Sequence, residues 1–302
     1  MKKVIDHSIQ SSLLRYLQYR TLVDLEAYHT VTGELFRYED PRYDLIAYGA
    51  PEGGWVYDKI SGVIPPSIPG YSRGVSGMVC PDFINGRFLF SGDFPNIPLT
   101  GSYTVSEVNY YNSSDSMAKI LFEDKYQQSP VLKPAASYLE PYSFITPCVF
   151  VKAFETNNEP YCLGGEDWTI VQYKLICLMP NESYLAGIGK VIRDCRQEIF
   201  PLLKNFALNQ YGDLKTINWD YEHFMKVNDY YGFISDATFK PEEPDVFISQ
   251  NPNMFIGIGN IEVRIVRRPG DPNSDVDLST SYALTDISDI FDTDIQDEFT
   301  LD

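Results

Sequence analysis

The chain has 302 residues, 44% of them apolar, which is enough for one large domain or two smaller ones with a buried core. Its 42 acidic and 24 basic residues give a formal net charge of −18, so nucleic-acid backbones and anionic membranes should repel it on average. No apolar run is long enough for a transmembrane helix, and the first residues turn polar too early for a signal peptide. We therefore expect a soluble protein that is made in a cytoplasm and does not bind DNA tightly.

The predicted elements begin with an amphipathic helix over about residues 4–20. Four apolar residues recur at every fourth position, which places them on one face of a helix: Ile5, Ile9, Leu13 and Leu17. We expect this helix to dock on a sheet that forms later in the chain. Residues 1–32 are therefore assigned to the same domain as that sheet.

Residues 33–126 contain short strand-like segments that are interrupted by glycine and proline. This pattern is typical of an antiparallel β module. Its clearest local signal is Asn85-Gly86, which lies between two apolar segments. Both residues tolerate the positive φ of a two-residue hairpin turn, so the sequence predicts a hairpin there.

A proline-rich stretch, residues 127–143, follows the module and contains Pro130, Pro134 and Pro141. Proline lacks the backbone donor that helices and central strands need, so we expect a linker or a strapping loop. Residues 144–268 then contain three apolar strand patterns, at residues 147–154, 168–179 and 255–266. They indicate the main sheet of an α+β domain.

The most regular helix pattern lies between the second and third of these strands, over about residues 181–200. Its apolar residues alternate in steps of three and four and form one seam: Leu185, Ile188, Ile192, Cys195 and Ile199. Asn181 can cap the start of this helix, and Pro201 lies beyond its end. We expect the seam to pack on the sheet made by residues 148–151, 169–178 and 256–266.

Residues 217–227 alternate between two sets of side chains, with Trp219, Tyr221, His223 and Met225 on one side and Asp220, Glu222, Phe224 and Lys226 on the other. Such alternation is typical of a half-buried strand. The pair Asn228-Asp229 then favours a turn into a further apolar segment, residues 230–239. The sequence therefore predicts a second hairpin.

The last residues, 269–302, form an acidic extension, with ten acids and no base from Gly270 onward. Its composition is typical of a solvated, disordered tail. The alternative is a peptide or short helix that folds onto a neighbouring subunit. The candidates for that docking fall near one helical face: Ile287, Ile290, Phe291, Ile295 and Phe299.

Residue types that carry chemistry form no recognisable constellation. The three histidines lack ligand spacing, and the GIG segments at residues 187–189 and 257–259 lack the third glycine of a phosphate-binding loop, which favours close packing. The cysteines contain no CxxC pair, and we interpret all five as small core residues: Cys80, Cys148, Cys162, Cys177 and Cys195. We expect neither an enzyme nor a cofactor or metal site.

The order of these elements resembles that of the tail terminator, or tail completion, proteins of tailed bacteriophages. The resemblance rests on the first helix and on the patterns at residues 147–154, 164–179, 181–203, 230–239 and 254–268. The inserted β module departs from the compact plan of that family.

This resemblance implies a tail-terminator-like mixed sheet with packed helices, in a structural virion protein without an active site. Members of the family close as a ring, expected here to be a hexamer, at the head-proximal end of the tail tube. The expected partners are further copies of the chain, a tail tube or sheath protein on one side, and a head connector or neck protein on the other. DNA would pass through the lumen without specific binding, and the protein would assemble in the host cytoplasm without membrane contact.

A carbohydrate- or receptor-binding virion protein is the alternative hypothesis, because the chain contains 22 tyrosines and 18 phenylalanines. In that case the β module would recognise a ligand through Trp55 and the rings near it. An enzyme whose site no motif reveals is a third hypothesis.

Overall fold

The computed structural model describes residues 5–40, 45–50, 52–122, 125–128, 143–160, 167–203, 207–209, 211–216, 219–227, 230–242 and 254–267. Helices and two main sheets make up this part of the chain, which confirms the predicted α+β fold class. The acidic extension and its five apolar candidates lie outside the described residues.

Six strands form the larger sheet, in the order β11-β12-β13-β10-β9-β6. They are β6 (Asn109–Asn112), β9 (Cys148–Pro160), β10 (Asp167–Met179), β11 (Ile199–Pro201), β12 (Tyr231–Glu242) and β13 (Phe255–Arg267). Neighbouring strands are antiparallel except β6 and β9, which run parallel. The three apolar patterns of the sequence correspond to β9, β10 and β13, so these predicted strands are confirmed.

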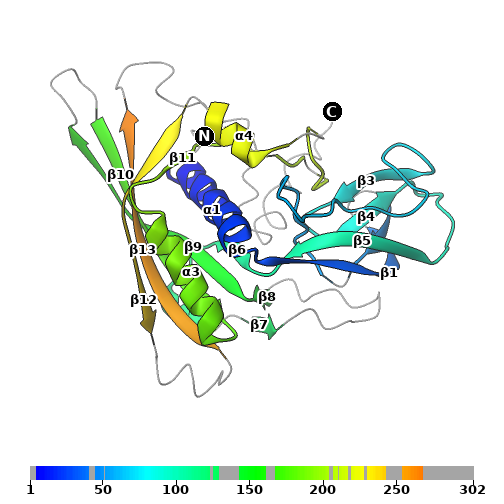
Figure 1. Ribbon diagram of the computed structural model, residues 1–302, viewed down its shortest axis with the longest axis horizontal. Helices are drawn as coiled ribbons and strands as arrows, with labels where there is room; N and C mark the ends of the chain where they lie inside the picture. The colour runs from blue at the N-terminus through cyan, green and yellow to red at the C-terminus, as the bar shows by residue number, and fades with distance from the viewer. Residues whose placement is uncertain are drawn as a thin grey trace, which may run out of the picture.

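Two helices, α1 (Ile5–Asp24) and α3 (Glu182–Asp194), cover one face of this sheet (Figure 1). The first predicted helix is confirmed as α1, which continues to Asp24. Leu13 and Leu17 on α1 are at most 1% exposed. Because α1 lies between the two sheets, its polar residues Ser12 and Arg15 are buried as well (Figure 1).

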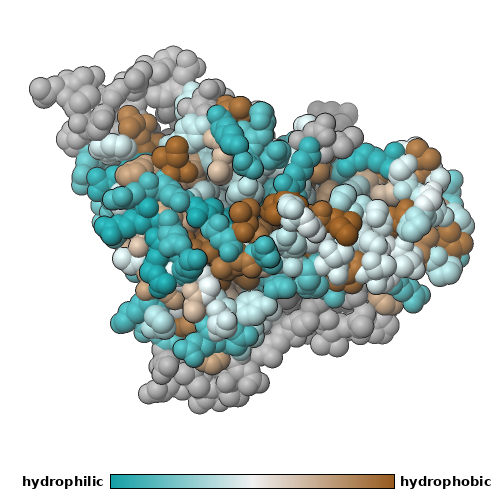
Figure 2. Space-filling view, viewed as in Figure 1, coloured by the Kyte–Doolittle hydropathy of each residue, from teal (hydrophilic) through white to brown (hydrophobic). Residues whose placement is uncertain are grey.

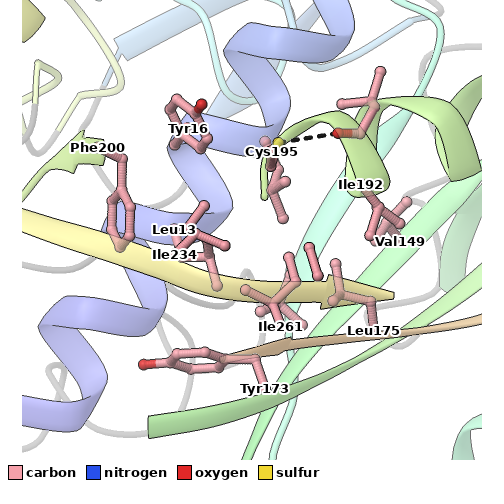
Figure 3. Close-up of a cluster of buried hydrophobic side chains, with 14 of the residues drawn as sticks. Leu13, Tyr16, Val149, Tyr173, Leu175, Ile192, Cys195, Phe200, Ile234 and Ile261 are labelled. Carbon is pink, nitrogen blue, oxygen red and sulfur yellow. Dashed lines mark hydrogen bonds between the residues drawn. The ribbon is translucent and has the colours of Figure 1, made fainter. Parts of the chain in front are cut away.

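The core beneath α1 and α3 contains side chains from both helices and from the strands of the larger sheet (Figure 3). Leu185, Ile188 and Ile192 of α3 are all buried in it, as the seam predicts. The side chain of Asn181 accepts a hydrogen bond from the backbone N–H of Tyr184 at 2.9 Å. This N-cap satisfies a donor that the first helical turn leaves unpaired, and it fixes where α3 begins.

The predicted end of this helix near Phe200 is wrong. The helix α3 ends at Asp194, and Cys195 is its buried C-cap, with its Sγ donating to the carbonyl oxygen of Val191 at 3.0 Å (Figure 3). Gln197 then adopts a φ of 65°, a left-handed conformation that ends the helical path. The chain continues into β11, where Ile199 is 58% exposed and therefore does not belong to the core seam.

The smaller sheet has five antiparallel strands in the order β3-β4-β2-β1-β5. They are β1 (Tyr28–Asp40), β2 (Leu45–Gly49), β3 (Met78–Asp82), β4 (Arg87–Phe90) and β5 (Leu99–Ser106). A short helix, α2 (Met117–Phe122), and β6 follow this sheet in the chain, and β6 joins the larger sheet. The antiparallel β module that the sequence predicts is therefore present.

The hairpin predicted at Asn85-Gly86 forms between β3 and β4, but its turn is longer than expected. Asp82 pairs with Arg87, which leaves four residues in the turn instead of two. The carboxylate of Asp82 accepts the backbone N–H groups of Ile84 and Asn85, both at 3.1 Å. Of the two predicted turn residues, only Gly86 has a positive φ, 64°. The Asp82 side chain thus organises a turn that needs only one left-handed residue.

The strand predicted over residues 217–227 is wrong, because this segment contains the helix α4 (Tyr221–Val227). Asp220 caps it by accepting the backbone N–H of His223 at 3.2 Å, and Lys226 pairs with Glu222 one turn earlier at 2.6 Å. Tyr221 and Phe224 lie on one helical face, with ring centroids 6.4 Å apart. These local helical interactions outweigh the alternating pattern. The following segment, residues 230–239, does contain a strand, β12.

The proline-rich stretch falls between two short strands, β7 (Lys125–Gln128) and β8 (Ser143–Thr146), which pair in parallel as a separate sheet. Residues 129–142, between them, lie outside the described residues, so the structure does not test the predicted linker.

Candidate assembly site on the larger sheet

The face of the larger sheet that is opposite α1 and α3, here called the outer face, is polar across its middle. Residues directly opposite in neighbouring strands point to the same face. One row across four strands consists of Thr238, Asn260, Lys174 and Lys152. The next row consists of Asp236, Glu262, Gln172 and Glu155. All eight are half-buried or exposed, so this part of the sheet faces water.

Apolar bands flank these polar rows on the same face. Towards one end of the strands, Ile176 and Ile258 are buried beneath Ile120 and Leu121 of α2. Towards the other end, the row containing Ile170 and Arg264 reaches Ile199 of β11 at the margin of the sheet. The helix α2 therefore covers only one end of the outer face.

The two margins of the larger sheet are each covered along part of their length. On one side, β11 pairs with residues 231–233 of β12. On the opposite side, β6 pairs with residues 148–151 of β9. Within the described part of the chain, no strand pairs with the outer margin of β12 beyond residue 233 or of β9 beyond residue 151. Two stretches of strand edge, at diagonally opposite corners, thus have no strand beside them among the described residues.

A β-bulge marks the start of each open stretch. The register of β9 shifts at Phe154, whose side chain is 54% exposed, and the register of β12 shifts at Ser235. Bulges increase the local twist and interrupt the ladder. Residues 155–159 and 236–240, which follow the bulges, are regular five-residue runs without proline. Residues 155–159 are all exposed, and so are Asp236, Thr238 and Lys240.

The sheet that carries these edges is fixed to the rest of the protein by a buried ion pair. Arg15 of α1 pairs with Asp58, which lies between β2 and β3, and the two side chains are 5% and 2% exposed. Burial lowers the pKa of the Arg15 guanidinium, but Asp58, Tyr57 and Tyr221 together raise that pKa by more, so the net shift is upward and the group stays charged. The guanidinium also lies over the rings of Tyr57 and Tyr221, 4.7 and 5.1 Å from their centroids. The helix α1, the segment between β2 and β3, and α4 therefore meet at Arg15.

A second connection runs through residues 211–216. The backbone N–H of Phe83 donates to the carbonyl oxygen of Gly212 at 2.9 Å, and Arg73 pairs with Asp213. Gly212 has a φ of 74°, and a Cβ there would lie 2.1 Å from Oδ1 of Asp82. Only glycine fits this approach to the smaller sheet. Figure 2 shows apolar side chains gathered in a band across the middle of the molecule, between the two sheets.

The chemistry-bearing residues are buried or scattered. Cys80, Cys148, Cys177 and Cys195 are buried free thiols, as predicted, and burial raises the pKa of Cys80 and of Cys195 to about 12. Cys162 lies outside the described residues. Among the residues that are described, no group of three His, Cys, Asp or Glu side chains is placed to hold a metal ion.

Two predictions about individual residues need correction. Trp55, the expected ligand platform, is 2% exposed and stacks on Tyr103, with ring centroids 4.8 Å apart and planes 17° apart. It belongs to the core of the smaller sheet and has no free face for a ligand. His223, expected on a strand, lies on α4.

The sequence patterns do not indicate the open edges directly. A signal was present, because β9 continues for five polar residues, Glu155 to Glu159, after its last aromatic residue. A strand that continues beyond its apolar core pattern has no local packing reason to do so. Whether a neighbour covers it depends on distant strands, which local patterns do not specify.

No protein-family model matches this chain, and no curated protein matches it either. Within the part of the chain that is described, no helix has the length and apolar character that crossing a membrane requires.

Proposed function

We propose that this protein is a structural virion protein of a tailed bacteriophage, which forms a ring in the neck at the head-proximal end of the tail tube. The ring terminates the tail and joins it to the head connector, and DNA passes through its lumen. The observation that carries this proposal is the pair of open edges at opposite margins of one sheet. The resemblance in element order to tail terminator proteins supplies the place in the virion.

Two different open edges favour a ring over a two-fold dimer. In a two-fold dimer one patch meets an identical patch, whereas a head-to-tail contact joins two different patches and closes when the rotation divides a full turn. Residues 155–159 and 236–240 are such a pair of different patches. Unpaired backbone groups in a long edge favour pairing with another chain.

The charge of the protein fits a channel that DNA traverses without binding. Six copies with a formal charge of −18 carry −108. Tight nucleic-acid binding depends on lysine and arginine contacts that release counterions, and a strongly acidic ring opposes such contacts. The polar rows of the outer face provide a surface that tolerates water in a lumen.

Electron microscopy and mass measurement of the purified full-length protein test the ring. We expect closed rings of uniform size, six copies each, at micromolar concentration. Open filaments, or a monomer at every concentration, would contradict the proposal. Immunogold labelling of phage particles that contain the protein tests its position. Label at the neck is expected, and label confined to the distal tail tip would overturn the assignment.

The alternative of carbohydrate binding through Trp55 and the rings near it gains no support from Trp55, whose ring is buried. That ring is stacked on Tyr103 and is also packed against Phe88, at 4.9 Å between centroids.

A further inference from the structure

We infer that neighbouring copies join by strand pairing, with residues 155–159 of β9 in one copy added to residues 236–240 of β12 in the next. This inference rests on the proposed ring and names the contact that closes it. The partner is a second copy of this chain, and the contact continues the larger sheet from copy to copy.

Strand direction permits this pairing. The strands β12, β13, β10 and β9 are antiparallel at each step, so β9 runs opposite to β12. A rotation about an axis roughly along the strands brings β9 of one copy beside β12 of the next in opposite directions. The new pair is therefore antiparallel, as all the contacts among these four strands are.

The strands β6 and β11 set the offset of the pairing. Glu155 lies level with Asp236, since Gln172 and Glu262 connect them across the sheet. If the two copies joined at the same level, Glu155 would lie opposite Asp236. In that arrangement β11, which lies beside residues 231–233 of β12, would collide with the end of β9 in the neighbouring copy. Full overlap of the two open runs instead places Glu155 opposite Lys240 and Asn157 opposite Thr238. This arrangement is offset by four residues, and it leaves room for both short strands.

The offset agrees with the geometry of closed sheets. Four strands at about 4.8 Å spacing are about 19 Å wide, and four residues at about 3.3 Å each span about 13 Å. One such step per copy corresponds to a strand tilt of about 35°, within the range of about 35–45° that closed barrels adopt. The tilt follows from the offset and the strand count per copy, so it does not depend on the number of copies.

The side chains that meet in this pairing include one attractive and one repulsive pair. Lys240, which lies 3.7 Å from Glu242 within its own chain, would face Glu155 of the neighbour on the outer face. At the other end of the run, Glu159 would face Asp236. Opposite charges directly across two strands stabilise a sheet and like charges destabilise it. The contact can therefore be weakened or strengthened by changes at exposed residues.

Paired cysteines test the contact directly. The variant carries Asn157→Cys and Thr238→Cys, which would be directly opposite, together with Cys162→Ser; the four described native thiols are buried. Mild oxidation should give a ladder of covalent multimers that ends at the size of the closed ring. Each single cysteine variant should stay monomeric on a denaturing gel. The matched control pair, Asn157→Cys with Glu222→Cys, uses an exposed site on α4 and should give no ladder.

Charge variants provide a measurement that needs no new thiol. Lys240→Glu should raise the dissociation constant of the ring about two- to fivefold per interface, and Glu155→Lys in the same chain should restore it. Glu159→Lys should lower that constant by a similar factor. All these residues are exposed, so thermal unfolding of the monomer should change little.

The outcomes separate this inference from the proposed function. The strand pairing would be overturned if rings form, oxidation gives no ladder of cross-linked multimers, and none of the three charge variants changes the dissociation constant of the ring. The proposed ring itself would then still stand. A wild-type protein that never forms rings would overturn the proposed function. A single Asn157→Cys variant that forms covalent dimers would show a two-fold contact and overturn both.

Discussion

The aromatic ring of Phe239 occupies the space that a side chain at Gly189 would need. A Cβ on Gly189 of α3 would lie 2.4 Å from Cδ1 of Phe239, and a Cβ on Gly257 of β13 would lie 2.3 Å from its Cζ. The Phe239 ring on β12 is thus held between Gly189 of α3 and Gly257 of β13, two positions without a side chain. This packing accounts for one glycine of each GIG segment, Gly189 and Gly257, and it places α3 close to the sheet.

We expect Gly189→Ala to destabilise the protein by about 1–3 kcal/mol, because the added methyl group forces the ring or the helix to move. The control is Gly187→Ala on the same helix, where a Cβ would meet only the flexible end of Leu25, at 3.3 Å. Alanine favours the helix over glycine, so the control should be neutral or stabilising by up to about 1 kcal/mol. Urea denaturation of the variants measures both values.

Replacing Phe239 by a smaller side chain should offset part of the destabilisation caused by Gly189→Ala. Phe239→Leu in the Gly189→Ala background should recover part of the lost stability, although the same change alone should cost about 1 kcal/mol or more. Equal losses in both glycine variants would show that helix propensity, and not the contact with Phe239, governs these positions.

Removing one partner of the Arg15–Asp58 pair should cost about 3–5 kcal/mol, since it leaves a charge buried without its counterion. Arg15→Met and Asp58→Ala test the two partners separately. The double variant should be less destabilised than the sum of the single variants, because it leaves no unpaired charge. Chemical denaturation of the four proteins gives the coupling energy, and strictly additive losses would refute a coupled ion pair.

The sequence specified the elements whose patterns are local and long. The strands β9, β10 and β13 and the helix α3 each bury a regular set of apolar residues, and Asn181 caps α3 as its position suggests. The secondary-structure prediction failed where a strand-like alternation and a helical period were both compatible with a few residues. In the segment that forms α4, the cap at Asp220 and the contact of Tyr221 with Phe224 favoured a helix over the alternation.

The candidate site could not be predicted, because it is defined by what lies beside a strand. Thr238 and Lys240 are unremarkable in the sequence, and so is Asn157. They form candidate edges only because β11 and β6 stop short along the sheet margins. Such an arrangement depends on pairings between residues far apart in the chain, for which a single sequence gives no local signal.

Ile192 and Ile199 separate the confirmed part of the predicted seam from its incorrect end. Ile192 is 2% exposed, so Ile192→Asp should cost more than about 4 kcal/mol and abolish cooperative folding. Ile199 is 58% exposed, so Ile199→Asp should change stability by no more than about 0.5 kcal/mol. Circular dichroism during thermal unfolding distinguishes the two. A soluble Ile192→Asp protein with a sharp transition would show that α3 does not pack as described.

The Ser235 bulge should be detectable through the titration of Glu262. The Ser235 hydroxyl donates to Oε1 of Glu262 at 2.6 Å, and together with the Arg264 guanidinium it lowers the pKa of this carboxyl below its ordinary value of 4.5. A carboxyl whose folded-state pKa is depressed contributes stability that is complete above the unfolded pKa and is lost as pH falls through the folded one. Ser235→Ala should therefore move the pKa of Glu262 upward, and the resulting loss of stability relative to the wild type should be complete above about pH 4.5 and shrink as the pH falls below that value. Thr238→Ala on the same strand should leave that pKa unchanged, and NMR titration of the side-chain carboxyl carbon measures both. An unshifted pKa in Ser235→Ala would mean that the bulge does not hold the hydroxyl against Glu262.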